Sequence, residues 1–477
     1  MPLTLDTKLA NSSPESATSR RSSLGAVLLL VLFVFWPAVH YQLVYDDLNQ
    51  LVHNPRLTAW SYVPGYFTTH LWSHRFAAPH YYRPVFLIWF RLLYACLGAP
   101  SSTWHIASIL AHLVTTACVF ILIRSLTGGF KGAALAAMLF AIHPINTEAV
   151  AWVSAGDDLL LTMFLVLTVF YYAKRQGPIS VPSIIFAALA MFTQETGILA
   201  PALIIAYEWT QSRFKNAVIN AIPYALSSLF YLAFRVNALR TPIVVSAPSI
   251  SMGTMVLTWP RLLAVYAFHL VWPVHLSISY DVPVEIRLWP LLLLIAVLAG
   301  LLWLVRSGCA NIRFGAAWFA ITLAPSLAIR YLDWDDFVHD RYLYLPLVGL
   351  ALIAAVWFNR LQFNHTRVAA AGALVLALCW GTRLNLRIWQ DNISLFSQAV
   401  RTAPRNPVFK NDLVVSYFKD HRDSEALPLL RQLIEQYPNF PDGYRTMAYY
   451  YRQVGNVSEA ERYYSIYASI SSQPEAP

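Results

Sequence analysis

Apolar runs of membrane-spanning length recur along most of the chain, separated by short polar segments. A helix that crosses a bilayer needs about 20 apolar residues, and fewer suffice where helices bury one another. Eleven spans are predicted, near residues 24–40, 105–123, 131–145, 158–173, 181–195, 197–211, 216–236, 289–305, 313–330, 341–358 and 367–381. The pattern therefore indicates an all-α, polytopic membrane protein.

Two further apolar runs do not fit as spans. Residues 83–98 carry Arg91 in mid-run, and residues 259–273 carry Arg261 and His269. Counting either run alone as a span would invert the charge pattern downstream. We interpret both as helices in the outer interface, where Trp, Tyr and Arg are favourable.

Basic clusters follow alternate predicted spans and assign the two sides of the membrane. They are "RSLTGGFK" (124–131), "AKRQG" (173–177), "QSRFK" (211–215), "VRSGCANIR" (305–313) and "NRLQFNHTR" (359–367). Short loops rich in Lys and Arg stay in the cytoplasm. The loops 41–104, 146–157, 237–288 and 331–340 are then expected outside.

The first residues agree with this orientation. Residues 1–22 are polar and carry Lys8, Arg20 and Arg21, and the apolar run that follows ends in "WPAVHY" without a small-residue cleavage pattern. We therefore expect a disordered cytoplasmic tail and an uncleaved first span rather than a signal peptide.

Composition supports the membrane class, since 57% of the 477 residues are hydrophobic and 12% are charged. The net charge of +9 is spread over short clusters, which is unlike a nucleic-acid-binding surface. The four cysteines lie in or beside apolar segments without metal-ligand spacing, so they are expected to be packing residues.

From about residue 391 the chain becomes polar and repeats itself. Pro404 and Pro438, Tyr417 and Tyr451, and other pairs recur 34 residues apart. That period is typical of tetratricopeptide repeats, each a helical hairpin. We predict a repeat domain over 386–477, outside the membrane and following a membrane domain over 23–385, that serves as a docking platform or as a cap on the membrane domain.

The expected outer loops collect carboxylates. They are Asp46, Asp47, Glu148, Asp157, Asp158, Glu195, Asp281, Glu285, Asp333, Asp335, Asp336 and Asp340. The pairs Asp46/Asp47 and Asp157/Asp158 lie where a loop meets a span, and ionisable groups there usually mark a site. If both pairs share a cavity, repulsion would raise the pKa of one carboxyl and make it a candidate general base.

Arg83 and Arg341 are candidates for holding a phosphate opposite that base, through bidentate hydrogen bonds. Two alternatives stay open at this point: Arg83 snorkels at the interface, and Arg341 pairs with its neighbour Asp340.

At these residues the sequence resembles the transmembrane and tetratricopeptide-containing protein O-mannosyltransferases, and more widely the GT-C glycosyltransferases. The matching strings are "VYDDLNQLVHNP", "YYRPVFLIWFRLLY", "HPINTEAVAWVSAGDDLL", "WPVHLSISY" and "HDRYLYLPLVG". The resemblance implies a GT-C membrane domain that moves a sugar, with inversion, from a polyprenyl-phosphate donor to a hydroxyl of a protein acceptor.

The resemblance also implies roles for individual residues. Asp46 corresponds to the catalytic base with Asp47 beside it, and Asp158 to the acidic residue of the second loop. Two family cations are absent here, because Gly156 replaces an Arg and Gln194 replaces the Lys of a Lys-Glu pair. Donor binding then rests on Arg83, Arg341 and His275, with Glu148, Asp157 and Glu195 as supporting residues. No protein metal site is predicted, and a divalent ion bridging Asp158 and the phosphate is left open.

Alternative functions are transfer to a lipid or glycan acceptor, or a non-catalytic scaffold that assembles partners through the repeats. The compact size favours a bacterial inner membrane with the repeats in the periplasm over the endoplasmic reticulum. The sugar and the acceptor are not specified by the sequence.

Overall fold

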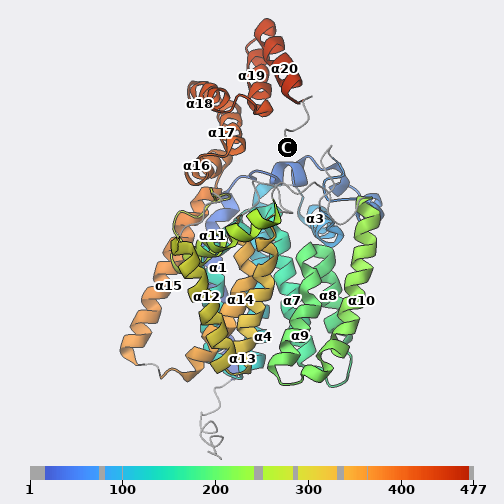
Figure 1. Cartoon of the computed structure of the whole chain (residues 1–477), viewed down its shortest axis with the longest axis vertical. Helices are drawn as coiled ribbons and strands as arrows, with labels where there is room; N and C mark the ends of the chain where they lie inside the picture. The colour runs from blue at the N-terminus through green and yellow to red at the C-terminus, as the bar shows by residue number, and fades with distance from the viewer. Residues whose placement is uncertain are drawn as a thin grey trace, which may run out of the picture.

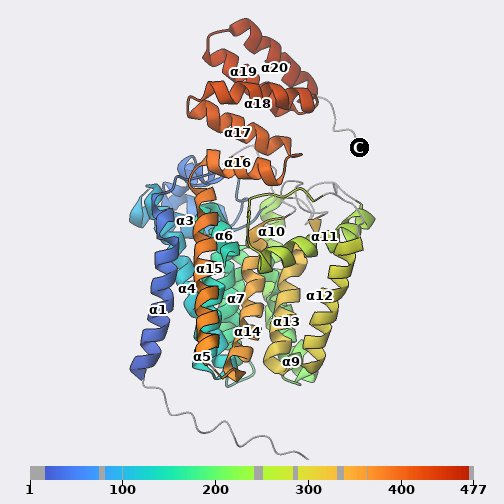
Figure 2. The ribbon, with the colours of Figure 1, turned by 90° about the vertical axis from the view of Figure 1, so that its left-hand side faces the viewer.

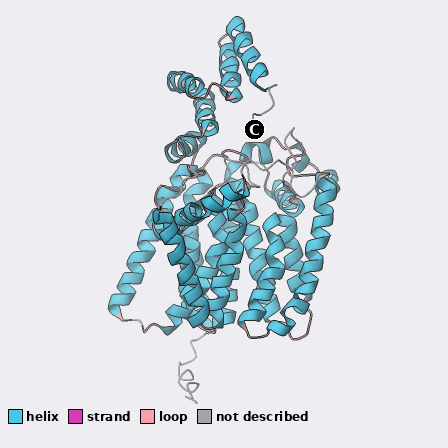
Figure 3. Ribbon diagram, viewed as in Figure 1, coloured by secondary structure: helices cyan, strands magenta, loops and turns pink. Residues whose placement is uncertain are grey.

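The computed structural model describes residues 17–74, 81–98, 100–240, 251–282, 288–329, 338–362 and 364–471. These residues form helices and loops without strands (Figure 3). A long helical bundle is crowned at one end by a smaller stack of helices (Figure 1).

Each predicted span coincides with a helix of the bundle. These helices are α1 (Ala17–Phe35), α4 (Ser101–Thr127), α5 (Phe130–Ile142), α7 (Gly156–Ala173), α8 (Val181–Thr193), α9 (Ala200–Thr210), α10 (Phe214–Leu239), α12 (Leu288–Ser307), α13 (Ala310–Leu323), α14 (Tyr344–Arg360) and α15 (His365–Leu386). α1 begins inside the predicted tail, whose residues 1–16 lie outside the described part.

By length and apolarity, six helices among the described residues could each cross a membrane, or seven if the bent pair Phe130–Ile142 and Pro144–Ala151 forms one span. The chain is thus a multi-pass membrane protein. The count of eleven stays a prediction, because helices such as α9 and α13 are shorter than a free-standing span requires.

Two helices lie at the crowned end of the bundle. α3 (Pro84–Leu97) and α11 (Met252–Val271) both occur there, and α11 runs across the bundle rather than along it (Figures 1 and 2). α11 is nevertheless one of the six helices of spanning length. Its sequence alone therefore does not distinguish an interfacial helix from a span.

The basic connections gather at the opposite end. The side-chain amide of Asn311 donates to the carbonyl of Leu126 over 2.8 Å, and the amide of Gly132 donates to Asn359 Oδ1 over 3.1 Å. A cavity of about 250 Å³ at this end is lined by residues of four of the five basic clusters and their flanks, among them Ser125, Lys174, Gln211 and Asn311. The charge segregation expected from the sequence is therefore present in three dimensions.

Five helices follow the bundle: α16 (Asn392–Thr402), α17 (Pro407–Lys419), α18 (Asp423–Gln436), α19 (Pro441–Gln453) and α20 (Val457–Ser471). α17 and α19 begin 34 residues apart, as do α18 and α20, which matches the sequence period. The tetratricopeptide assignment itself stays a prediction.

α16 packs against the apolar core of the bundle, and Phe409 and Leu413 of α17 extend that core. Leu395, Phe396 and Ala399 of α16 belong to the apolar core of the bundle. A separate small core, which includes Leu430 and Met447, holds α17 to α19 together.

Candidate active site

The first acidic pair follows α1 and its extension η1 (Trp36–His40) in a loop with an unusual backbone. Tyr45 has φ of 53°, a left-handed conformation that non-glycine residues adopt at a cost in free energy. Asp46 comes next and is half-buried, whereas Asp47 is completely buried. The turn thus leaves one carboxylate of the pair partly accessible to solvent and buries the other.

Asp47 fastens this loop to the second acidic region. Its Oδ1 accepts hydrogen bonds from the Ser154 amide at 2.7 Å and the Ser154 hydroxyl at 2.6 Å, and its Oδ2 accepts from the Val44 amide at 3.2 Å. Burial raises the pKa of Asp47 to about 7, although these hydrogen bonds favour the carboxylate and oppose the shift. At Asp47 itself the cause of the raised pKa is burial.

The second acidic pair begins α7 and is joined to the first arginine. The Arg83 guanidinium, just before α3, contacts Asp157 Oδ2 at 2.5 Å and Glu195 Oε2 at 2.9 Å. Arg235 of α10 contacts the other oxygen of Glu195 at 3.0 Å. Burial alone would lower the pKa of Arg83, but the carboxylates of Glu195 and Asp157 raise it above its ordinary value. Arg83 is therefore an ion-paired residue of the cluster and not merely an interfacial one.

The second arginine joins the same cluster from the other side. Arg341 in η10 (Asp340–Leu343) contacts Glu148 Oε1 at 3.2 Å and lies 3.7 Å from Asp158 Oδ2. His339 Nδ1 is 2.7 Å from Glu148 Oε1. The Gln194 amide donates to Asp158 Oδ1 over 2.9 Å. Asp158 Oδ2 is buried and makes no hydrogen bond within the described residues.

The site is therefore two runs of alternating charge that meet at the adjacent carboxylates Asp157 and Asp158, and we call it the acidic-arginine cluster. It comprises Glu148, Asp157, Asp158, Glu195, Arg83, Arg235 and Arg341. Four carboxylates face three guanidinium groups, so the cluster carries no surplus of positive charge. Buried charges of this kind are stable only when each is paired or hydrogen-bonded.

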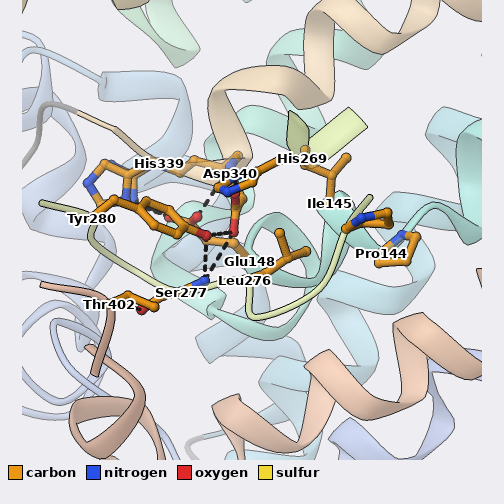
Figure 4. A network of polar contacts seen from close by, with 12 residues as sticks. Pro144, Ile145, Glu148, His269, Leu276, Ser277, Tyr280, His339, Asp340 and Thr402 are labelled. Carbon is orange, nitrogen blue, oxygen red and sulfur yellow. Dashed lines mark hydrogen bonds and ion pairs between the residues drawn. The ribbon is translucent and has the colours of Figure 1, made fainter. Parts of the chain in front are cut away.

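The structure gives Asp340 a different partner from the one considered in the sequence. His269 Nδ1 lies 2.9 Å from Asp340 Oδ1, and the Tyr280 hydroxyl donates to Asp340 Oδ2 over 2.7 Å (Figure 4). Arg341 instead pairs with Glu148 and Asp158. Adjacent residues thus face different networks.

Other predicted residues are not brought into the cluster. His275 is exposed, with φ of 57°, and no contact among the described residues joins it to the arginines. Asp281 accepts a hydrogen bond from the Arg405 amide at 3.3 Å, toward α16. Glu285, Asp333, Asp335 and Asp336 lie outside the described residues.

Sequence reasoning did not single out Ser154, Arg235 or His339, and it noted Gln194 only as a departure from the family. Arg235 could have been found, because a charged residue inside an apolar helix is expensive unless it is paired. Ser154 offered no signal, since a small polar residue in a loop is ordinary. At the place where the family has a Lys, Gln194 keeps a hydrogen-bond donor to Asp158 but not a charge.

Within the described residues, no group of three or more His, Cys, Asp or Glu side chains is placed to hold a metal ion. The carboxylates of the cluster are instead engaged by arginines.

No family model matches the chain. Over most of its length, however, it is similar to protein O-mannosyl-transferases. It is 23% identical to one from Caenorhabditis elegans over 76% of this chain and 55% of the relative, 21% identical to human TMTC3 (93% and 54%), and 25% identical to human TMTC1 (83% and 53%). The resemblance that the motifs indicated is thus confirmed, as a distant one. The chain spans about half the length of these curated relatives.

Two solved structures are also similar, each with a TM-score of 0.42. One is an Archaeoglobus fulgidus oligosaccharyltransferase tethered with an acceptor peptide, at 12% identity over 79% of this chain and 55% of that one. The other is ArnT from Cupriavidus metallidurans bound to undecaprenyl phosphate, at 15% identity over 96% and 76%.

Proposed function

We propose that this chain is a membrane glycosyltransferase of the GT-C type that moves a sugar from a polyprenyl-phosphate donor to a Ser or Thr hydroxyl of a protein. One observation carries the proposal. Asp47 ties the first acidic junction to Ser154, just ahead of the second junction, whose carboxylates pair with Arg83 and Arg341 at the end of the bundle opposite the basic connections. The distant similarity to protein O-mannosyl-transferases supports mannose as the sugar.

In the proposed reaction Asp46 is the general base. It is half-buried, and its neighbour Asp47 is fixed to Ser154 just ahead of α7. The Asp46 carboxylate takes the proton of the acceptor hydroxyl as the oxygen attacks the anomeric carbon. The bond from that carbon to the phosphate oxygen breaks on the opposite face, so the configuration inverts and polyprenyl phosphate leaves with the electron pair.

Arg83 and Arg341 take the departing phosphate. Each of these side chains is more than four-fifths buried, and fixed positive charge acts more strongly in such a place than in water. Asp157 and Glu148 orient these arginines through the contacts described above. Asp158 Oδ2, which makes no hydrogen bond within the described residues, accepts one from a sugar hydroxyl of the donor. We assign no role to His275 here, because no contact among the described residues joins it to the arginines.

The test uses the full chain in lipid nanodiscs with polyprenyl-phosphate-mannose and a Ser/Thr peptide. Asp46→Asn should lower the transfer rate by a factor of about 10² to 10⁴, the usual contribution of a general base. Asp420→Asn, at an exposed position between α17 and α18, is the matched control and should keep the wild-type rate.

Equal rates for Asp46→Asn and wild type would refute the assignment of the base. Transfer to an added lipid or glycan but not to peptide would favour the alternative acceptor class. No transfer with any acceptor would favour a scaffold. The identity of the membrane, bacterial inner membrane or endoplasmic reticulum, stays a prediction.

A further inference from the structure

The first turn of α16 holds the loop that carries Asp46. The Tyr45 amide donates to Asn392 Oδ1 over 2.8 Å, and the Gln42 amide donates to the Gln390 carbonyl over 3.0 Å. The Tyr45 ring packs edge-on against Phe396 at 6.0 Å between centroids. The left-handed residue directly before Asp46 is thus fixed by a side chain nearly 350 positions away.

The last turn of α16 holds a second loop, residues 274–282, which is hydrogen-bonded to Asp340, the residue before Arg341. The Thr402 hydroxyl lies 2.8 Å from both Ser277 Oγ and the Ser279 carbonyl. The Ser277 amide donates in turn to Asp340 Oδ2 over 3.2 Å (Figure 4). Thr402 is thus linked through Ser277 to Asp340 by two successive hydrogen bonds. The next residue is Arg341, the second arginine proposed to bind the phosphate.

The side chain of Asn392 is not needed to build α16 itself. Asp391 caps the helix, because its carboxylate accepts from the Ser394 amide at 2.7 Å. The apolar contacts of Leu395 and Ala399 attach the helix to the bundle. The hydrogen bond that Asn392 Oδ1 accepts from the Tyr45 amide is therefore available for fixing the loop.

We propose that α16 is a clamp in which Asn392 and Thr402 are positioning residues that fix the loops carrying Asp46 and Arg341 relative to each other. The proposal rests on the function proposed above, in which one loop supplies the base and the other a cation for the leaving phosphate. Because both must act on one donor molecule, a shift of about 1 Å between them can cost about 10²-fold in rate.

The kinetic test compares Asn392→Ala and Thr402→Val with Arg401→Ala, an exposed position on the same helix. Each clamp variant should lower kcat about 10-fold to 100-fold, with little change in the donor KM, since the arginines are untouched. Asn392→Asp keeps an oxygen that accepts from the Tyr45 amide, so it should recover most of the lost kcat. A kcat for both clamp variants equal to that of Arg401→Ala would overturn the proposal.

A second measurement does not depend on activity. Hydrogen exchange of the segment 41–52 should be faster in Asn392→Ala than in Arg401→Ala, while exchange in α4 and α7 stays at the wild-type rate. If exchange in 41–52 is unchanged in Asn392→Ala, the clamp is overturned, whether or not the protein is active. If exchange there is faster but the wild-type protein is inactive, only the proposed function is overturned. If exchange also rises in α4 and α7, Asn392→Ala has unfolded the bundle, and Thr402→Val with exchange of 274–282 decides instead.

Discussion

Arg341 lies between carboxylates on one side and aromatic rings on the other. Its guanidinium is 4.5 Å from the Trp152 ring centroid and 5.4 Å from that of Tyr342. Planar stacking of this kind suits Arg and not Lys, because the ammonium is a compact, strongly hydrated charge. The guanidinium is therefore held in place by its neighbours, and in the proposed reaction the donor phosphate would share it with Glu148 and Asp158.

Asp47 makes the stability of the protein depend on pH. Its folded-state pKa of about 7 lies above the ordinary value of 3.8, so between those values the folded protein holds a proton that the unfolded chain has released. Stability from this group is fully present below about pH 4 and is lost as the pH rises through 7. Asp47 should accordingly contribute a fall in the midpoint of thermal unfolding between pH 5 and pH 7.5, which adds to the contributions of other titrating groups.

Asp47→Asn should flatten that fall, because the variant side chain does not titrate. It should also lower stability overall by about 1 to 3 kcal/mol, since an amide offers one acceptor oxygen where the carboxylate offers two, and the Val44 amide loses its partner. Unfolding curves in detergent at several pH values measure both effects. Asp420→Asn should keep the wild-type slope, and a wild-type slope in Asp47→Asn would assign the pH dependence to another group.

At the scale of elements, α13 and α14 approach each other through two glycines. A Cβ added to Gly349 would lie 2.4 Å from the carbonyl oxygen of Gly315, and one added to Gly315 would lie 2.6 Å from that of Gly349. Small residues let helix backbones come together in membranes, where packing replaces the hydrophobic effect as the driving force. This crossing supports α14, whose first turn follows Arg341.

Gly349→Ala should therefore destabilise the protein by about 1 to 3 kcal/mol, the usual cost of overpacking. Gly372→Ala in α15 has open space around the added Cβ and should be neutral or gain up to about 1 kcal/mol from helix propensity. Thermal unfolding of the two variants side by side measures the difference. Equal midpoints would mean that α13 and α14 can move apart to accept the added methyl group without any loss of stability.

The elements were more predictable from the sequence than their contacts. Apolar runs gave the bundle helices, since burial in lipid or protein demands continuous apolarity, and the 34-residue period matches the spacing of α17 to α20. Arg83 and Arg341 were identified as residues of a site, but their pairing with Asp157, Glu195 and Glu148 was not, because ion pairs depend on packing between distant segments. The link from Tyr45 to Asn392 had no sequence signal, since a backbone amide and a helical Asn are both common.

For the whole molecule, the separation of charge predicts how the chain lies in a membrane. Two cysteines report on it: Cys96 is exposed on α3 at the crowned end, and Cys309 is exposed in the basic connection before α13. A membrane-impermeant maleimide applied to right-side-out vesicles should label Cys96 and leave Cys309 unlabelled, because basic loops stay inside.

Cys96→Ser should abolish that labelling, and detergent should make Cys309 reactive in the same preparation. Cys118 is buried and serves as an internal negative control. Labelling of Cys309 in sealed vesicles would reverse the orientation assigned to the site and to α16 through α20.

The packing of α16 also decides where this protein can be cut and recombined. A chimera that exchanges everything after α15 would remove Asn392 and Thr402 together with the repeats, and it would place a foreign helix against the Tyr45 turn and the 274–282 loop. A junction after Thr402 leaves those contacts native, and α17 to α20 can then be exchanged if the replacement keeps the packing of Phe409 in α17 against Phe396 in α16. The helices beyond α16 could in this way diverge, in the laboratory or in evolution, while the contacts that hold the Tyr45 turn and the 274–282 loop stay unchanged.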